Sequence, residues 1–292
     1  GSHDEKRILS TSEIIKSPGI PDTAPLIVKA LEKGIPVISE IEFASRYTDA
    51  KIIAITGSNG KTTTTMLTYH ILKEAGYNVG LAGNIGDSFA KQVAEKSFDY
   101  YVLELSSFQL DGIVEFKPLV SVILNITPDH LDRYDYKFEN YINSKFRITK
   151  NQTRNEVLIY WEEDKSITGK LDTVNAVKVP YCEGYQSDDF QLQGRHNELN
   201  ANAAYLAAMS VGIENEIIEK AINSFQSVKH RLQSVKTIDG IEFINDSKAT
   251  NVDAVYYAID GIQKPIWWIV GGVDKGNDYS VLFPFLNKIK GV

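Results

Sequence analysis

The fold is decided by the stretch Ile52–Ile53–Ala54–Ile55–Thr56–Gly57–Ser58–Asn59–Gly60–Lys61–Thr62–Thr63. An apolar strand pattern ends at Thr56, a glycine-containing loop follows, and a helical pattern begins at Lys61. A strand, a glycine loop and a helix in this order form the context of a phosphate-binding P-loop. The sequence therefore predicts an α/β protein whose open, mostly parallel sheet carries a phosphate site at the carboxyl ends of its strands.

Each residue type in this loop suits phosphate binding. Glycines let backbone N–H groups approach phosphate oxygens, and the start of the following helix adds the positive end of a dipole. The Lys61 ammonium is expected to reach the β- and γ-phosphates, and the Thr62 hydroxyl to bind Mg²⁺. An ordinary surface turn is the alternative, and Ile55 stands where the general pattern has its first glycine. The predicted nucleotide contacts in the loop are Gly57, Ser58, Asn59, Gly60, Lys61, Thr62 and Thr63.

Length and composition limit the class of protein. The chain has 292 residues, enough for about two domains, and a formal net charge of −7 that argues against a general nucleic-acid binder. Its one cysteine, Cys182, excludes an intrachain disulfide and favours a reducing compartment. No apolar run approaches the ~18 residues of a membrane span. We therefore expect a cytoplasmic protein that binds neither nucleic acid nor membrane. We also expect it to be a monomer.

Three zones follow one another along the chain. Residues 1–48 hold only a turn-rich Ser17–Pro21, a helical pattern at Ala24–Lys33 and a strand pattern at Ile35–Ile38, so they are predicted to be the remnant of an N-terminal domain. Residues 49–229 alternate strand and helix signals and form the predicted central ATP-binding domain. Residues 230–292 are predicted to be a truncated Rossmann-like domain. The opening Gly1–Ser2–His3 resembles the remainder of a purification tag, and His3 is assigned to no site.

The expected elements are these. Near-continuous apolar runs predict parallel strands covered on both faces. In the central zone they are Lys51–Thr56, Asn78–Ala82, Tyr100–Leu105, Val120–Ile126 and Glu156–Tyr160, with helices at Lys61–Ala75, Phe138–Lys150 and Glu198–Val211. In the last zone, strand Ile241–Asn245, helix Val252–Ile259 and strand Ile266–Val270 predict one βαβ unit.

Two polar residues follow strand ends in the central zone. Glu104 ends the predicted strand at Tyr100–Leu105, where a carboxylate is a candidate Mg²⁺ ligand or simply a solvated acid. His130 follows the next strand, with Asp129 and Asp132 beside it, and is a candidate metal ligand through its neutral imidazole. A structural role is the alternative for this histidine.

Lys145 lies on the apolar face of its predicted helix. It is seven residues after Phe138 and four after Tyr141, so helical spacing places it in the stripe that these two form with Ile142. An unpaired buried ammonium is costly. Either the side chain extends to water, or the amine lies near a metal or phosphate or is modified so that it loses its charge.

Further polar groups occur toward the end of the chain. Asn197 is a plausible N-cap of the helix that carries Asn200, whose amide is either a capping group or a contact to base or sugar. Arg231 falls in the linker before the last zone, where it can approach triphosphate when domains close. Asp246–Asn251 and Gly271–Gly276 each follow a predicted strand, at the edge where α/β sheets bind ligands.

Taken together, these residues resemble the Mur ligases, the ATP-dependent amino-acid-adding enzymes of peptidoglycan synthesis. The resemblance rests on the short loop Thr56–Thr62, on Glu104–Leu110 and on Asn245–Asn251, with further agreement at Ser17–Ile20 and Gly83–Gly86. It covers essentially the whole chain after its opening residues. Within the family these segments are most similar to the enzymes that add D-glutamate.

The resemblance implies a role for each matching residue. Catalytic residues are Lys61, His130, Lys145 and Lys248. A first Mg²⁺ is bound by Thr62 and Glu104, and a second by His130 with a CO₂-derived carbamate on Lys145. ATP is contacted by the loop, Asn200, Arg231 and Asp246, and the substrates by Ser17, Gly19, Asn84, Lys248, Thr250 and Lys275, of which Lys275 departs most from the family's pattern.

The implied reaction joins D-glutamate to UDP-N-acetylmuramoyl-L-alanine. Its carboxylate attacks the ATP γ-phosphate, and the amine of D-glutamate displaces phosphate from the acyl phosphate. Two alternatives stay open: a relative that adds another amino acid, including a folylpolyglutamate-type ligase, and a nucleotide-dependent switch that binds a partner protein.

Overall fold

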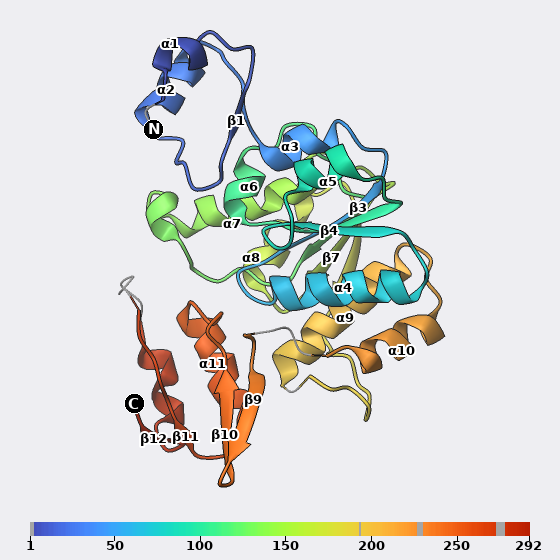
Figure 1. The fold of residues 1–292 in the computed structure, drawn as a ribbon, viewed down its shortest axis with the longest axis vertical. Coiled ribbons are helices and arrows are strands. Elements are labelled where there is room, and N and C mark those ends of the chain that lie inside the picture. Colours follow the sequence, from blue (N-terminus) through green and yellow to red (C-terminus); the bar gives the residue numbers. More distant parts are fainter. Residues whose placement is uncertain (1–2, 193, 227–229, 273–277) are drawn as a thin grey trace.

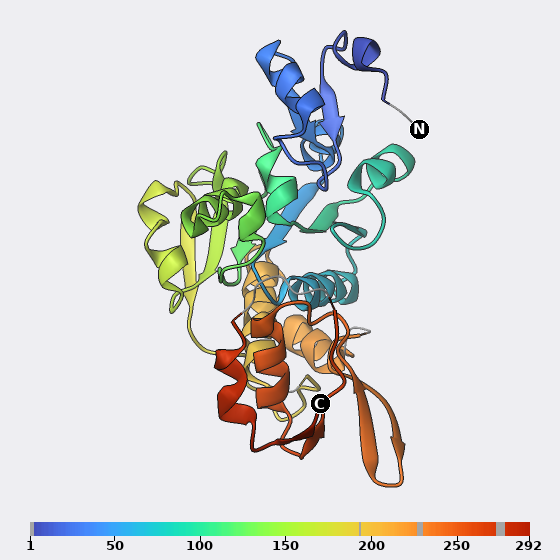
Figure 2. The same ribbon diagram turned by 90° about the vertical axis from the view of Figure 1, so that its left-hand side faces the viewer.

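The computed structural model describes residues 3–192, 194–226, 230–272 and 278–292 (Figure 1). It confirms an α/β chain with a central sheet, a smaller part formed by the first residues and a second smaller part formed by the last. These two parts lie at opposite ends of the long axis (Figure 2). None of the described helices is both long enough and apolar enough to cross a bilayer.

The central sheet has six strands, all parallel to their neighbours. They are β3 (Lys51–Thr56), β4 (Val79–Gly83), β5 (Tyr100–Glu104), β6 (Val120–Ile123), β7 (Val157–Trp161) and β8 (Val177–Tyr181). The order in the sheet is β4-β5-β3-β6-β7-β8, so the chain passes from one side of β3 to the other between β5 and β6. The carboxyl end of β3 therefore lies at the switch point, where open α/β sheets bind ligands.

Helices cover both faces of this sheet. Ile53 and Ile55 of β3 belong to one apolar core, and Ile52 and Ala54 to the other, as alternate strand residues must. The first core is closed by α4 (Lys61–Glu74), α9 (Arg195–Met209) and α10 (Asn215–Ser224). The second is closed by α3 (Glu40–Ser45), α5 (Phe89–Glu95), α6 (Ser107–Asp111) and α7 (Phe138–Phe146). Burial on both faces explains the nearly continuous apolar sequence of the strands.

Several predicted bounds need correction. The helix expected from Phe138 ends at Phe146 and continues as a 3₁₀ turn over Arg147–Thr149. The helix expected at Glu198 begins at Arg195, so Asn197 lies inside its first turn and is not its N-cap. Gly194 occupies the N-cap position with φ 93°, a conformation that only glycine adopts easily. The helix therefore begins three residues earlier in the sequence than predicted. Four further helices of the central part, α5, α6, α8 (Lys165–Thr168) and α10, and strand β8 were not predicted.

The N-terminal part contains α1 (Glu5–Ile8), β1 (Ile14–Lys16), α2 (Pro25–Glu32) and β2 (Val37–Ser39). The two strands pair in parallel through residues 14–16 and 37–39. This part is joined to the central sheet by α3, whose Ile41 and Ala44 belong to the second core.

Glu42 fastens α3 to the loop after α6. It is fully buried, and its Oε2 accepts hydrogen bonds from the backbone N–H groups of Val114, Glu115 and Phe116 at 2.8, 3.0 and 2.9 Å. Its Oε1 contacts the Arg46 guanidinium at 3.3 Å. The buried carboxylate thus accepts three backbone N–H groups of one loop and also contacts Arg46.

We predict that Glu42→Ala lowers the free energy of unfolding by about 3–5 kcal/mol, because one partner of a buried charged network is lost. Urea unfolding measures this change. Glu13→Ala removes the other carboxylate that contacts Arg46, on the exposed side, and is expected to cost less than about 1 kcal/mol. Equal losses in the two variants would contradict the buried role of Glu42.

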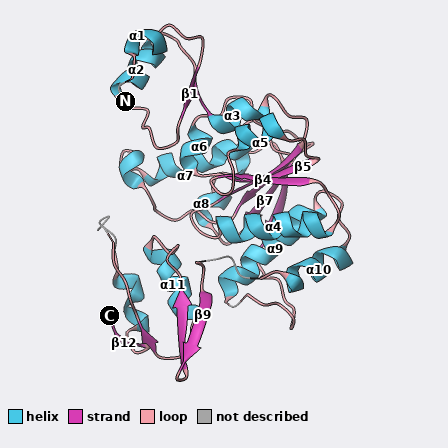
Figure 3. Cartoon of the chain, viewed as in Figure 1, coloured by secondary structure: helices cyan, strands magenta, loops and turns pink. Residues whose placement is uncertain are grey.

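The C-terminal part differs from the predicted βαβ unit. Its strands are β9 (Gln233–Ile238), β10 (Ile241–Asn245), β11 (Ile266–Trp267) and β12 (Ile289–Gly291), with α11 (Val252–Gly261) and a 3₁₀ helix η4 (Ser280–Phe285). β10 pairs antiparallel with β9, and β11 pairs with β12, so β10 and β11 lie in different sheets (Figure 3). The predicted pairing is wrong because Asp239–Gly240, both at positive φ, form a two-residue hairpin turn.

Candidate active site

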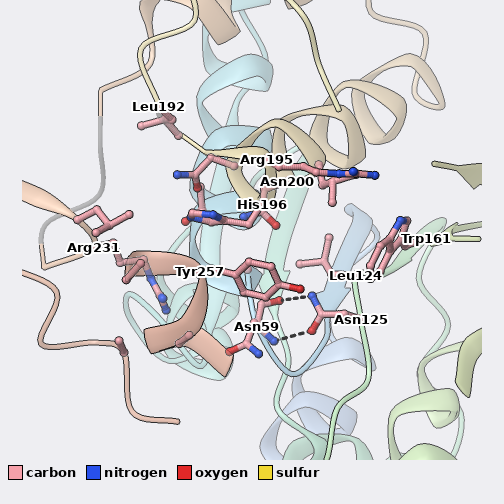
Figure 4. Close-up of a pocket in the computed structure, with 18 of the residues that line it drawn as sticks. Asn59, Leu124, Asn125, Trp161, Leu192, Arg195, His196, Asn200, Arg231 and Tyr257 are labelled. Atoms are coloured by element: carbon pink, nitrogen blue, oxygen red, sulfur yellow. Dashed lines mark hydrogen bonds between the residues drawn. The ribbon is translucent and has the colours of Figure 1, made fainter. Parts of the chain in front are cut away.

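The phosphate loop Gly57–Thr63 joins β3 to α4, as predicted. It is hydrogen-bonded to Asn125, which lies two residues after the end of β6. Asn125 accepts the backbone N–H of Ser58 on its carbonyl at 2.8 Å and the N–H of Asn59 on Oδ1 at 2.8 Å. Its Nδ2 donates to the Asn59 carbonyl at 3.1 Å (Figure 4). Sequence reasoning missed Asn125 because the predicted strand Val120–Ile126 ran through it, whereas β6 ends at Ile123.

Two glycines of the loop have physical reasons to be glycine. A Cβ on Gly57 would lie 3.0 Å from the Leu124 Cβ, which is tighter than ordinary packing. Gly60 has φ 84°, and a Cβ there would lie 2.2 Å from Oδ1 of Asn200. The predicted nucleotide contact Asn200 is therefore placed directly against the loop.

Lys61 is folded back over its own loop. Its ammonium donates to the carbonyl oxygens of Gly57 and Ser58, both at 2.8 Å. Burial lowers the pKa of this amine, and the nearby carboxylates of Glu104 and Asp129 oppose that shift. The charge of Lys61 is thus positioned at the mouth of the loop.

Arg231 reaches the loop from the C-terminal part. Its Nη2 donates to the Thr62 hydroxyl at 3.0 Å, whereas its buried Nε has no partner among the described residues. Burial lowers the pKa of this guanidinium, while Glu104 and Asp246 raise it. The arginine therefore has donor capacity left for an anion.

Glu104 has a free carboxylate oxygen beside the loop. Its side chain is buried, and Oε1 accepts from Asn84 Nδ2 at 2.9 Å. Oε2 is buried and has no hydrogen-bond partner in the described chain. An orphaned carboxylate oxygen near a threonine hydroxyl and a phosphate loop fits a divalent cation such as Mg²⁺.

Lys145 is buried at 1% exposure, so the alternative that its head extends to water is wrong. Its amine donates to the Gly57 carbonyl at 2.8 Å and lies 4.6 Å from the ring centre of Tyr141. Burial and the charge of Lys61 lower the pKa of this amine well below its usual value, and Asp129 and Asp111 oppose the shift. Burial thus favours the neutral form of this amine over the ammonium form.

His130 lies at the rim of the same cavity. It has φ 51°, and its ring packs edge-on against Phe108 at 5.1 Å between centroids. Its Nε2 is 3.6 Å from Asp129 Oδ2, and the side chain is 44% exposed. In the described part of the chain, no three His, Cys, Asp or Glu side chains are grouped as a metal site. The metal role of His130 stays a prediction.

A cavity of about 550 Å³ gathers residues from all three parts of the chain. Of the predicted site residues it is lined by Gly19, Ser58, Asn59, Gly60, Lys61, Thr62, Asn84, Glu104, His130, Lys145, Arg231, Lys248 and Thr250. Ser17 does not line it, although Pro18 and Gly19 do. Lys275 lies outside the described residues.

A second cavity, of about 310 Å³, shares Asn59, Gly60 and Arg231 with the first (Figure 4). Its wall combines the predicted Thr63, Asn200, Arg231 and Asp246 with aromatic and apolar side chains that were not predicted, namely Leu124, Trp161, Tyr181, His196 and Tyr257. Burial lowers the pKa of His196 to about 4, so its imidazole is neutral. Such a wall suits a flat heteroaromatic base whose phosphates extend over the loop.

Comparison with known proteins agrees with this geometry. Residues 55–187 match the Mur ligase middle domain. UDP-N-acetylmuramoylalanine–D-glutamate ligase of Bacteroides fragilis is 52% identical over 305 residues, which is 96% of this chain and 69% of that protein. The enzyme of the same name from Christiangramia forsetii is 49% identical over 317 residues, covering 99% and 71% of the two chains.

Solved structures share the fold. MurF from Acinetobacter baumannii superposes with a TM-score of 0.63 at 21% identity, over 76% of this chain and 56% of that one. MurF ligase from Thermotoga maritima in complex with ADP gives a TM-score of 0.61 at 16% identity, over 87% and 75%. At these identities the structures support the fold, whereas the sequence relatives decide the family. The chain belongs to the Mur ligase family, in its UDP-N-acetylmuramoylalanine–D-glutamate ligase branch.

Proposed function

We propose that this chain catalyses the ATP-dependent joining of D-glutamate to UDP-N-acetylmuramoyl-L-alanine in the synthesis of peptidoglycan precursors. The observation that carries the proposal is the larger cavity. It brings a phosphate loop, a buried carboxylate and a polar segment of the C-terminal part to one place. The name that the sequence relatives share supplies the substrates. It also argues against the alternative of a binding switch.

The reaction has two steps. A carboxylate oxygen of the alanyl group attacks the γ-phosphorus of ATP, the bond to the bridging oxygen breaks, and ADP and an acyl phosphate form. The amine nitrogen of D-glutamate then attacks the acyl carbon, phosphate leaves with the electrons of the C–O bond, and the nitrogen loses a proton. Lys61 and Arg231 provide positive charge where negative charge develops on the transferred group.

Mg²⁺ would neutralise phosphate charge in this site. Glu104 and Thr62 are the proposed ligands of a first ion, because the buried Glu104 Oε2 has no hydrogen-bond partner among the residues that the structure describes. His130 and a carbamate on Lys145 are the proposed ligands of a second. The carbamate forms when the neutral Lys145 nitrogen attacks the carbon of CO₂ and loses a proton.

The two cavities divide the substrates. We assign the base and ribose to the smaller cavity, with Asn200 and Asp246, since that wall is aromatic and lies beside the loop. We assign the muramoyl and amino-acid groups to the larger cavity. Their proposed contacts are Ser17, Gly19, Asn84, Lys248, Thr250 and Lys275, with Lys248 also a catalytic residue. We further propose that the protein acts in the cytoplasm as a monomer.

A product assay tests the proposal. The protein is incubated with ATP, Mg²⁺, UDP-N-acetylmuramoyl-L-alanine and each of a panel of amino acids, and products are identified by mass. We expect phosphate release that requires both acceptor and UDP-sugar, and product with D-glutamate. Product with another amino acid alone would identify a different branch, and phosphate release without either substrate would contradict ligation.

A further inference from the structure

Asn59 of the phosphate loop is hydrogen-bonded both to the central sheet and to the C-terminal part of the chain. Its backbone N–H and carbonyl are both held by the side chain of Asn125, at 2.8 and 3.1 Å. Its own side chain accepts a hydrogen bond on Oδ1 from Nδ2 of Asn251, at 3.0 Å. The loop is thus fixed to the central sheet by its backbone and to the C-terminal part by a side chain.

Asn251 uses both ends of its amide. Its Oδ1 accepts the backbone N–H of Ala254 at 2.8 Å and caps the first turn of α11. Its Nδ2 donates to Asn59. A single side chain therefore connects the start of α11 to the loop. A movement of the helix or of the loop alters the hydrogen bond between Asn251 and Asn59.

A second contact between the same two parts is Arg231 to Thr62, at 3.0 Å. Asn59 and Thr62 are at different points of the loop, so two contacts restrict rotation of the C-terminal part about the loop more than one contact does. The segment between the strand end at Asn245 and the cap at Asn251 contributes Ser247, Lys248 and Thr250 to the wall of the larger cavity. Its position relative to the loop is therefore set partly by Asn251.

We propose that Asn251 is a positioning residue for the ligation reaction, an inference that rests on the proposed function. Through Asn59 it holds the segment Asp246–Asn251 in register with the phosphate loop, so that the acyl phosphate and the attacking amine meet. Its oxygen caps α11 and its nitrogen donates to Asn59, so the contacts that carry the proposal are those to the helix and to the loop.

Two substitutions separate the link from the cap. Asn251→Ser keeps an oxygen that caps helices well but is too short to reach Asn59. Asn59→Ala removes the acceptor and leaves the backbone bonds to Asn125. We expect each to lower kcat about tenfold, as loss of one hydrogen bond in a preorganised site does. For Asn251→Ser the Kd for ADP should stay within about twofold, since this substitution leaves every residue of the phosphate loop in place.

The double variant is decisive. If the two residues act through one bond, Asn251→Ser with Asn59→Ala is no slower than the slower single variant. Multiplied effects would overturn the proposal, as would parental kcat in both single variants. Asn155→Ser, at an exposed asparagine in the turn before β7, is the matched control and should keep the parental kcat.

Amide hydrogen exchange gives a readout that does not depend on ligation. In the ligand-free protein, Asn59→Ala should speed the exchange of backbone amide hydrogens in the first turn of α11, although Asn59 lies in the central part and α11 in the C-terminal part. Unchanged exchange there would overturn the link. If the parent protein makes no product with D-glutamate, the proposed function fails, whereas the exchange experiment still decides whether Asn59 and Asn251 are connected.

Discussion

Lys61→Ala is expected to lower the rate of nucleotide turnover by at least about a hundredfold, because a charge aimed at the transferring phosphoryl group is lost. The side chain contacts only the loop carbonyls of Gly57 and Ser58 among its described hydrogen-bond partners, so the fold should survive. ATP-dependent phosphate release measures the rate, and circular dichroism checks the fold.

Lys73→Ala is the matched control, since it removes an exposed lysine from the last turn of the same helix. It should keep both activity and stability. A Lys61→Ala protein that is folded and turns over ATP at the parental rate would show that the loop does not bind the reacting phosphates.

Lys145→Ala is expected to abolish most ligation, and a short carboxylic acid added to the buffer should restore part of it. The carboxylate would take the place of the proposed carbamate, an anionic oxygen ligand suited to Mg²⁺. The buried position of the amine and its lowered pKa favour the neutral form that reacts with CO₂. Product formation is measured against acetate and propionate concentration.

The pH dependence of stability follows from the same residue. An unfolded chain protonates this lysine up to its ordinary pKa, whereas burial lowers the pKa in the folded protein. Between these two pKa values the unfolded state binds more protons, so the contribution of unmodified Lys145 to stability rises with pH there.

Lys150→Ala, at an exposed site just beyond the same helix, is the control for the rescue of Lys145→Ala by added acid. Lys150→Ala should keep the parental activity with and without added acid. Failure of both acids to restore Lys145→Ala, or parental activity of Lys145→Ala without acid, would contradict the carbamate.

Much of the central part could be predicted from sequence because its signals are local. The strand–loop–helix pattern placed Lys61 and Thr62, and helical spacing placed Lys145 on a buried face. Glu104 followed from its position at a strand end. In each case one element and its period were sufficient.

The remaining features depend on contacts between distant segments. Asn125 gains its role only from the pairing of β3 with β6. Trp161 and Tyr257 line the same cavity although they are almost a hundred positions apart in the sequence. Asp239–Gly240 is a typical two-residue hairpin turn, and the sequence analysis did not use it. The register of the last part therefore could not be read from its apolar runs.

The carbonyl of Gly57 accepts hydrogen bonds from both Lys61 and Lys145. In this arrangement the Lys61 ammonium donates to backbone carbonyl oxygens, although the same N–H groups are the ones that a nucleotide's phosphates would need. Binding then exchanges one set of acceptors for another, so the enthalpy gained at Lys61 is a difference between two hydrogen-bonded states. When Lys61 turns toward phosphate, the Gly57 oxygen keeps Lys145 as its remaining lysine partner, and the two amines cease to share a single acceptor.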